Sequence, residues 1–237
     1  MVKYRQIADE IRKKIADGEF YLGRQLPLEK ELCVQYGVSR ITIKRSIDEL
    51  VKLGVVVKRR GSGTFVKSVD DEEFKNFRRG RQFSGFTEIN HGREIYTEVL
   101  QFSIVHPDGE IAEKLQIPPD DFVYDIIRTR YVDGRPIVIE YTKMPIQLLP
   151  GIKKDILEKS IYAYIQDELK LKIQSAHRAI CAVMPNEIEK KELAIQEVLP
   201  LLEIKQTAFL DDGRAFEYSI SHHRADEITF KTVSMCG

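Results

Sequence analysis

The sequence predicts an α+β protein that folds as two domains. A chain of 237 residues has room for about two domains. Its first part has the apolar spacing of short helices followed by two short strands, whereas the rest alternates strand-like and helical segments. The charge also divides: residues 1–68 hold 15 basic and 8 acidic residues, a net of +7, and the rest hold 22 and 29, a net of −7. We expect domains over 1–68 and 83–237, joined by a charged linker over 69–82 that lacks an apolar period.

Three short helices are predicted in the first domain. Apolar residues at helical spacing indicate a helix over residues 4–16. A second helix over residues 29–36 ends at Gly37, since glycine is favoured just past a helix end. Ser39 is a good N-cap for a third helix, which runs to about Leu53.

The third helix combines a buried apolar stripe with polar groups at its exposed start. The stripe, which comprises Ile43, Ile47, Leu50 and Val51, leaves hydrogen-bond donors in the first turns. These donors are Arg40, Thr42, Lys44 and Arg45. A recognition helix needs donors there, because its N-terminal residues meet base edges and phosphates in the major groove.

A basic hairpin is predicted directly after the third helix. Residues 55–58 and 64–67 read as strands, and residues 59–63 form a tip that contains Arg59, Arg60 and Gly63. One helix with a basic start is more often only a solvated surface. The order of three helices and a basic hairpin favours a winged helix-turn-helix, and therefore double-stranded DNA as the partner.

Strands and helices alternate in the second domain, and a mostly antiparallel arrangement is expected. Turn signals such as Asp133-Gly134 join neighbouring strands. The predicted strands are 96–105, 122–132, 137–142, 174–184, 204–210 and 215–222, and the predicted helices are 110–115, 161–169 and 186–196.

Two arginines on one predicted strand suggest an anion site. Side chains repeat every second residue along a strand, so Arg128 and Arg130 project from one face, roughly 7 Å apart. Two such guanidiniums suit a phosphate or a carboxylate. The alternative is a pair of surface arginines neutralised by an acid, of which Glu140 is the nearest candidate. A two-residue turn at Asp133-Gly134 places Glu140 opposite Ile127, on the other face, and so leaves the arginines free.

Two further segments hold candidate polar contacts. Ser160 is either an ordinary N-cap or a ligand contact, and Tyr162 lies off the apolar stripe of its helix. In the last strand Glu217, Ser219, Ser221 and His223 share one face. A solvated strand face explains this polar set equally well.

Neither a metal site nor an enzyme is expected. The adjacent residues His222 and His223 point opposite ways on a strand, and no Cys or His has zinc-site spacing. No nucleophile with a base partner is recognisable. The three cysteines are scattered and odd in number, which disfavours a disulfide framework. With no long apolar run or apolar leader, the sequence indicates a soluble cytoplasmic protein without a membrane partner.

The first domain resembles the DNA-binding domain of the GntR family of bacterial transcription regulators. The resemblance rests on YRQIADEIRKKIADGEFYLGRQLPLEKEL, VSRITIKRSIDEL and RGSGTFV. It implies DNA contacts from Lys30, Ser39, Arg40, Thr42, Lys44 and Gly63. This chain departs from the family at Leu28, where serine or alanine is usual, and at Lys30 and Lys44, where arginine is common. Lysine lacks the bidentate donor pair that arginine offers to guanine, so Arg40 is the expected specificity residue.

The second domain resembles the UTRA effector domain of the HutC subfamily, whose fold is similar to that of chorismate lyase. RTRYVDGRPIVIEYTKMP, SIY and EYSISHHRAD carry this resemblance from about Gly80 onward. His223 stands where tyrosine is usual. An imidazole there alters the hydrogen bonding and is able to titrate near neutrality, so the resemblance does not identify the effector. The resemblance implies an effector pocket lined by Ser84, Gly85, Phe86, Arg128, Arg130, Ser160, Tyr162 and Glu217.

The resulting hypothesis is a homodimeric repressor that binds operator DNA in the bacterial nucleoid and needs no cofactor. A small anionic metabolite, such as a sugar phosphate or a carboxylate, is expected to change its affinity for DNA. Two alternatives remain open. The C-terminal domain either only dimerises, or is an enzyme of chorismate-lyase-like fold.

Overall fold

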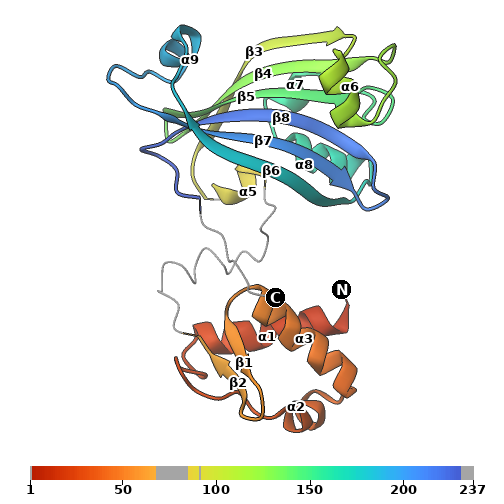
Figure 1. Cartoon of the computed structure of the whole chain (residues 1–237), viewed down its shortest axis with the longest axis vertical. Coiled ribbons are helices and arrows are strands. Elements are labelled where there is room, and N and C mark those ends of the chain that lie inside the picture. Colours follow the sequence, from red (N-terminus) through yellow and green to blue (C-terminus); the bar gives the residue numbers. More distant parts are fainter. Residues whose placement is uncertain (1, 68–84, 91, 231–237) are drawn as a thin grey trace. The chain divides into compact units, whose positions relative to one another are not determined.

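The computed structural model of the chain describes residues 2–67, 85–90 and 92–230. These residues form two compact units, the first from the residues before position 68 and the second from those after position 84; Figure 1 labels the elements of each. The predicted linker over 69–82 and the predicted effector residue Ser84 lie outside the described residues. Among the helices that are described, none is both long and apolar enough to cross a membrane.

The first unit consists of three helices and a hairpin, as predicted. The order is α1 (Lys3–Ala16), α2 (Glu29–Tyr36), α3 (Arg40–Lys52), β1 (Val56–Arg59) and β2 (Gly63–Val66). Ser39 caps α3, because its hydroxyl accepts a hydrogen bond from the backbone N–H of Thr42 at 3.4 Å. Gly37 ends α2 at a φ of 61°, in the left-handed region that glycine adopts without strain.

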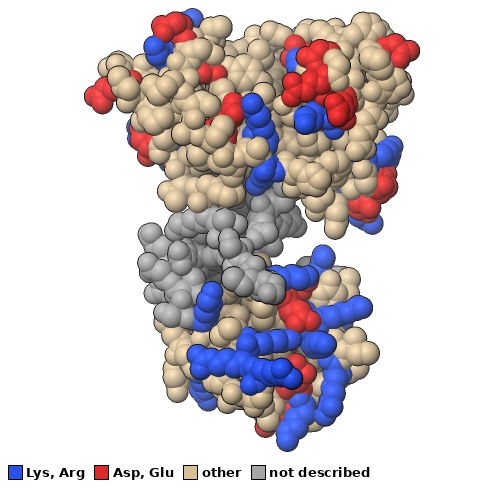
Figure 2. Space-filling view, viewed as in Figure 1, with Lys and Arg blue, Asp and Glu red and all other residues tan. Residues whose placement is uncertain are grey.

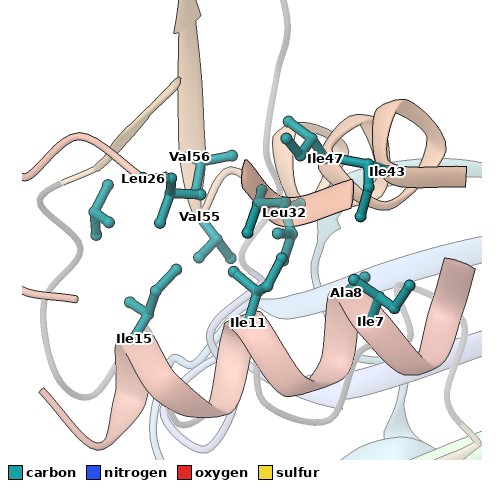
Figure 3. Packing of buried hydrophobic residues seen from close by; sticks show 12 residues of the cluster. Ile7, Ala8, Ile11, Ile15, Leu26, Leu32, Ile43, Ile47, Val55 and Val56 are labelled. Atoms are coloured by element: carbon teal, nitrogen blue, oxygen red, sulfur yellow. The ribbon is translucent and has the colours of Figure 1, made fainter. Parts of the chain in front are cut away.

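One apolar core holds these elements together. Ile7, Ile11 and Ile15 project from one side of α1 toward residues of α2, α3 and the hairpin (Figure 3). Ile43 and Ile47 of α3 meet them, and all five side chains are buried. Burying an isoleucine stabilises the fold by about 1.5–3 kcal/mol, so this packing fixes α3 against α1 and leaves its opposite face to solvent.

The tip of the hairpin is tied to the segment before α2. The side-chain amide of Gln25 donates a hydrogen bond to the carbonyl of Ser62 at 2.7 Å, and Gln25 also bridges to Phe65. Gly63 has a φ of +114°, and a Cβ added there would lie 2.3 Å from the Gln25 amide nitrogen. The positive φ therefore favours glycine at position 63, and any larger residue would also displace the Gln25 side chain from its place against the hairpin.

The second unit is built on one antiparallel sheet of six strands in the order β3-β4-β5-β8-β7-β6. The predicted mostly antiparallel architecture is confirmed. β5 and β7 begin earlier than predicted, and β5 also continues further. The strands are β3 (Ile95–Val105), β4 (Val123–Val132), β5 (Arg135–Pro145), β6 (Ile173–Val183), β7 (Leu201–Leu210) and β8 (Ala215–Arg224).

Short helices cover both faces of this sheet. On one face, α7 (Lys154–Leu157), α8 (Ile161–Ala163) and the π-helical turn η1 (Tyr164–Glu168) pack on a buried apolar cluster. The other face carries α6 (Gly109–Leu115) and α9 (Glu187–Glu192), as Figure 1 shows. The helix α5 (Phe86–Ile89) precedes β3.

Two helices differ from their predicted form. The expected helix over 161–169 changes to π-helical hydrogen bonding after Ala163. The expected helix over 186–196 ends at Glu192, because Ala194 adopts a left-handed φ of 51° that a helix does not tolerate.

Candidate functional sites

The exposed side of α3 and its surroundings form the candidate DNA surface. Arg40, Lys44 and Arg45 are exposed on α3, as are Lys30 on α2 and Arg60 in the hairpin. Within the described part of the chain, none of the five forms an ion pair. Figure 2 shows Lys and Arg side chains spread over this unit, with few acidic groups between them. Free cations at this density suit a phosphate backbone.

Other predicted DNA contacts have structural roles as well. The hydroxyl groups of Ser39 and Thr42 hydrogen bond to each other at 3.0 Å, so both help to start α3. The Arg59 guanidinium lies 4.7 Å from the centre of the Phe65 ring. Lys58 forms an exposed ion pair with Asp48 of α3 at 2.6 Å, which links the hairpin to that helix.

The second candidate site centres on the two arginines of β4. Arg128 and Arg130 are buried, with 5% and 3% of their surface exposed. Arg128 donates a hydrogen bond to the Glu140 carboxylate at 2.6 Å and another to the Leu157 carbonyl at 2.9 Å. The expectation that Glu140 lies on the opposite face is therefore wrong.

A β-bulge explains that error. The turn is the expected one, because Asp133 and Gly134 both have positive φ and Tyr131 pairs with Pro136. Beyond that pair the register shifts by one, so Ile137 is unpaired and Arg128 faces Glu140. A one-residue shift reverses which face every later side chain occupies.

Arg130 is less closely paired than Arg128. Its guanidinium lies 3.8 Å from the Glu140 carboxylate, donates a hydrogen bond to the Thr87 hydroxyl at 3.1 Å and stacks 4.6 Å from the Phe86 ring centre. Burial lowers the pKa of Arg130 to about 10, although Glu140 acts in the opposite direction. Burial also acts to raise the pKa of Glu140, but the charges of Arg128 and Arg130 outweigh it and hold that pKa below its ordinary value.

Glu217 is the centre of a buried hydrogen-bonded group on β7, β8 and α8. Its carboxylate accepts hydrogen bonds from Gln206 at 2.9 Å and from Ser219 at 2.8 Å. The Gln206 amide also donates to the Tyr162 hydroxyl and accepts from Arg178 Nε at 2.7 Å. Burial raises the pKa of Glu217 and of Tyr162. Glu217 and Ser219 are each 5% exposed, so the solvated-face alternative is wrong for them.

The strand register places the arginines and the Glu217 group on one face of the sheet. Side chains directly opposite each other across antiparallel strands share a face. One such row runs from Arg130 through Val138 to His223, and a second runs from Arg128 through Glu140 to Ser221. A third row contains Ser219 and Gln206. Residues that lie far apart in the sequence therefore form one polar cluster.

His223 is part of this cluster in neutral form. Burial lowers its pKa to about 4, despite the opposing effect of Glu140, so this imidazole does not titrate near neutrality. Its Nδ1 is buried and has no hydrogen-bond partner among the described residues. The same holds for the Nε groups of Arg128 and Arg130. Buried polar groups without partners carry an energetic cost that a bound ligand would relieve.

The remaining predicted effector residues, Gly85, Ser160 and Tyr162, lie at or beside α8. A Cβ at Gly85 would lie 3.3 Å from the Tyr162 ring, so the backbone at this glycine lies close to that ring. The Ser160 hydroxyl accepts a hydrogen bond from the Ala163 N–H at 3.2 Å, which is the structural role considered as its alternative. The Tyr162 ring also packs edge-on against Phe216.

Sequence reasoning missed Arg178 and Gln206, which complete the cluster, and it placed Glu140 on the wrong face. Alternation alone does not identify them, since which strands are neighbours and how they are shifted depends on the whole sheet. His222 faces the other side of the sheet, where its ring nitrogens lie 2.6 Å from Glu189 and 2.9 Å from Glu203. In the described part of the chain, no group of His, Cys, Asp and Glu is arranged to hold a metal ion.

Comparisons with known proteins identify the family of each unit. Residues 3–66 match the model for bacterial regulatory proteins of the gntR family, and residues 90–229 match the UTRA domain. The chain is 36% identical to the HTH-type transcriptional regulator GmuR of Bacillus subtilis over 99% of both proteins. It is also 36% identical to the mannosyl-D-glycerate transport/metabolism system repressor MngR of Escherichia coli, over 98% of this chain and 95% of that one. The crystal structure of the possible transcriptional regulator YydK from Bacillus subtilis is similar, with a TM-score of 0.78 and 27% identity over 99% of this chain and all of that chain.

Proposed function

The chain belongs to the GntR family of bacterial transcriptional regulators, with a UTRA effector-binding domain after its winged helix-turn-helix. We propose that it is a repressor controlled by a small anionic effector such as a sugar phosphate. Its relatives are named as regulators, and the chain is a DNA-binding regulator rather than an enzyme. We assign residues 1–68 to operator binding, 69–82 to the linker and 83–237 to effector binding and dimerisation. The protein would act in the bacterial cytoplasm, on the nucleoid when it is bound to DNA.

The buried pair of arginines is the observation that carries the choice of effector. Two guanidiniums share the single carboxylate of Glu140, and Arg130 is the more weakly paired of the two. A buried charge without full pairing is costly, so an anion that reaches Arg130 is favoured there. Arginine also binds phosphate and carboxylate groups through two parallel hydrogen bonds.

The Glu217 group supports a sugar as the rest of the effector. Carboxylate, amide and hydroxyl groups lie together at Glu217, Gln206 and Tyr162, and such groups bind the hydroxyls of a carbohydrate by hydrogen bonds. The name of the MngR relative refers to mannosyl-D-glycerate, which is a sugar joined to a carboxylate. Neutral His223 would act as a hydrogen-bond partner and not as a third cation beside Arg128 and Arg130.

On the DNA side, we propose that α3 reads the operator through Arg40. Lys30, Lys44, Arg45 and Arg60 would contact phosphates. One recognition helix reads only a few base pairs, so a homodimer on a near-palindromic operator supplies adequate selectivity. If the effector weakens operator binding, the operator must weaken effector binding by the same factor.

A panel of ligands tests the effector assignment. Thermal shift and calorimetry would compare mannose 6-phosphate, glucose 6-phosphate, phosphorylated β-glucosides and small carboxylates with the neutral sugars. We expect stabilisation only by anions, and release of DNA that carries the sequence upstream of the protein's own transcription unit. A chain that binds this DNA but responds to no anion would instead support the alternative in which the C-terminal domain only dimerises.

Variants at the arginines locate the response. Arg130→Gln removes the charge but keeps a hydrogen-bond donor, and it should abolish the response to anions without loss of folding. Arg135→Ala is the matched control, because this arginine lies on the next strand with its side chain 62% exposed. An unchanged anion affinity in Arg130→Gln would show that the site is assigned wrongly.

A further inference from the structure

The side-chain amide of Gln206 is held in one orientation by its neighbours. Its oxygen accepts a hydrogen bond from Arg178 Nε at 2.7 Å. Its nitrogen donates to the Glu217 carboxylate at 2.9 Å and to the Tyr162 hydroxyl at 3.1 Å. A flipped amide would set its N–H groups against the N–H of Arg178 and its oxygen against a carboxylate, so that donor faces donor and acceptor faces acceptor. Arg178 fixes the orientation because a guanidinium is only a donor.

Glu217 is the acceptor at the other end of this group. Burial raises the pKa of Glu217, whereas hydrogen bonds from Ser219, Gln206 and Tyr162 act in the opposite direction. The donors therefore favour the carboxylate form against the effect of burial. A carboxylate has about four lone-pair sites, which is more than these three donors fill. Glu217 consequently offers a ligand the capacity to accept one further hydrogen bond.

The strand register brings Arg178 into line with this group. Arg178 on β6 lies directly opposite Gln206 on β7, and Gln206 lies directly opposite Ser219 on β8. Such a row shares one face of the sheet. Burial lowers the pKa of Arg178, whereas Tyr162 and Glu217 act in the opposite direction. The guanidinium and the Glu217 carboxylate thus stabilise each other's charge, and the Gln206 amide bonds to both.

We propose that Arg178 is a positioning residue that gives the effector site its preference for a sugar. Through Gln206 it holds Glu217 ready to accept a hydrogen bond from a hydroxyl group of the effector, while Arg128 and Arg130 bind the anionic group. The inference rests on the proposed function, because it assigns recognition of the sugar within the same site. It divides that site into two parts, which should respond to different substitutions.

Two probes of equal charge separate these parts by calorimetry of the full chain. Methyl phosphate carries the phosphate group without a hydroxyl, and glucose 6-phosphate and mannose 6-phosphate carry both. The wild type should bind at least one of the sugar phosphates more tightly than methyl phosphate. Arg178→Met should lower this preference about tenfold, because Glu217 loses an oriented donor, and should leave the affinity for methyl phosphate unchanged.

Lys205→Met is the matched control. Lys205 is next to Gln206 in β7, so its side chain lies on the other face of the sheet, where it pairs with Glu203 at 3.4 Å. This substitution removes the same charge for the same side chain, one residue away from the amide. The affinities for both kinds of probe should stay as in the wild type.

A double-mutant cycle tests whether Arg178 acts through Gln206. Gln206→Met should cause the same loss of preference as Arg178→Met, and the double variant should lose no more than either single one. Arg178→Lys keeps a charged donor and should retain most of the preference. The pH profile gives a further readout. Removal of the donor raises the pKa of Glu217, so in Arg178→Met the preference should disappear at a higher pH as the pH is lowered.

Thermal melts would verify that each variant folds, and Gln206→Met carries the test if Arg178→Met does not. Additive losses, an equal loss for methyl phosphate, or a wild type without preference for either sugar phosphate would overturn the role of Arg178. A wild type that binds none of the probes, and no other anion, would contradict the proposed function itself. The two failures are therefore distinguishable.

Discussion

The cations of the first unit and the arginines of the second both suit anionic partners, but by opposite physical means. Arg40, Lys44 and Arg45 are exposed and have no ion pair among the described residues. Arg128 and Arg130 are buried and share Glu140. Exposed cations attract an anion through a long-range electrostatic field, which salt screens. Buried cations bind an anion through short contacts, which water and salt screen only weakly.

This difference assigns distinct tasks to the two units. The electrostatic field of exposed cations attracts any duplex, and in the proposed function a few residues such as Arg40 read the sequence. A buried pair accepts only an anion that fits and that competes with a carboxylate already in place. Broad attraction suits a partner as long as DNA, and selective exchange suits a small metabolite.

The largest expected difference between the two sites is in how strongly salt weakens their affinities. Between about 50 and 200 mM salt, operator affinity is expected to fall roughly 10³-fold or more, because phosphate contacts release counterions. Effector affinity should fall less than about 10-fold over the same range, since buried charges are screened weakly. Fluorescence anisotropy and calorimetry on one preparation would measure both. If the two affinities depend equally on salt, the contrast between exposed and buried cations does not hold.

Removal of one buried arginine should destabilise the protein strongly. Arg128→Ala leaves Glu140 buried without its closest partner, and such a loss costs about 3–5 kcal/mol of unfolding free energy. Arg128→Met combined with Glu140→Leu removes both charges and should recover most of that loss. Urea unfolding of the second unit would measure the difference. If the single variant is as stable as the wild type, Glu140 is not held by Arg128 as described.

Acid should destabilise the second unit through His223. The folded pKa of about 4 lies below the ordinary 6.5, so the unfolded chain takes up a proton in this range and the folded chain does not. The unfolding free energy should therefore be full above pH 6.5 and fall by about 2–3 kcal/mol between pH 6.5 and 4.5. His223→Tyr, which restores the residue usual in the family, should flatten this part of the curve. A wild-type curve that is already flat there would contradict a buried neutral imidazole.

The smallest effect is expected for Arg40. Arg40→Ala should weaken operator binding by about 1–3 kcal/mol and relax base preference, while the unfolding free energy changes by less than about 0.5 kcal/mol. Lys52→Ala, at the far end of α3, is the control and should leave both nearly unchanged. If the footprint does not change in Arg40→Ala, other residues of α3 read the bases.

Local signals in the sequence were sufficient for the first unit. The apolar spacing of α1, the serine cap of α3 and the glycine after α2 each act within a few residues, so the three helices were predicted nearly to their ends. The strands of the second unit and the Asp133-Gly134 turn were also readable, because alternation and positive φ are local properties. The sequence also places Arg128 and Arg130 on one face without further information.

Only the tertiary structure decided what those arginines meet. A single unpaired residue, Ile137, brings Glu140 to Arg128, and no local sequence pattern predicts that bulge. The same is true of Gln206, which bonds to Glu217, and of Arg178, which bonds to Gln206, because β6, β7 and β8 are neighbours. The charge state of His223 likewise depends on burial by distant segments. The sequence determined the elements and their chemistry, whereas the pairing of strands, which sums weak contacts over the whole sheet, determined the site.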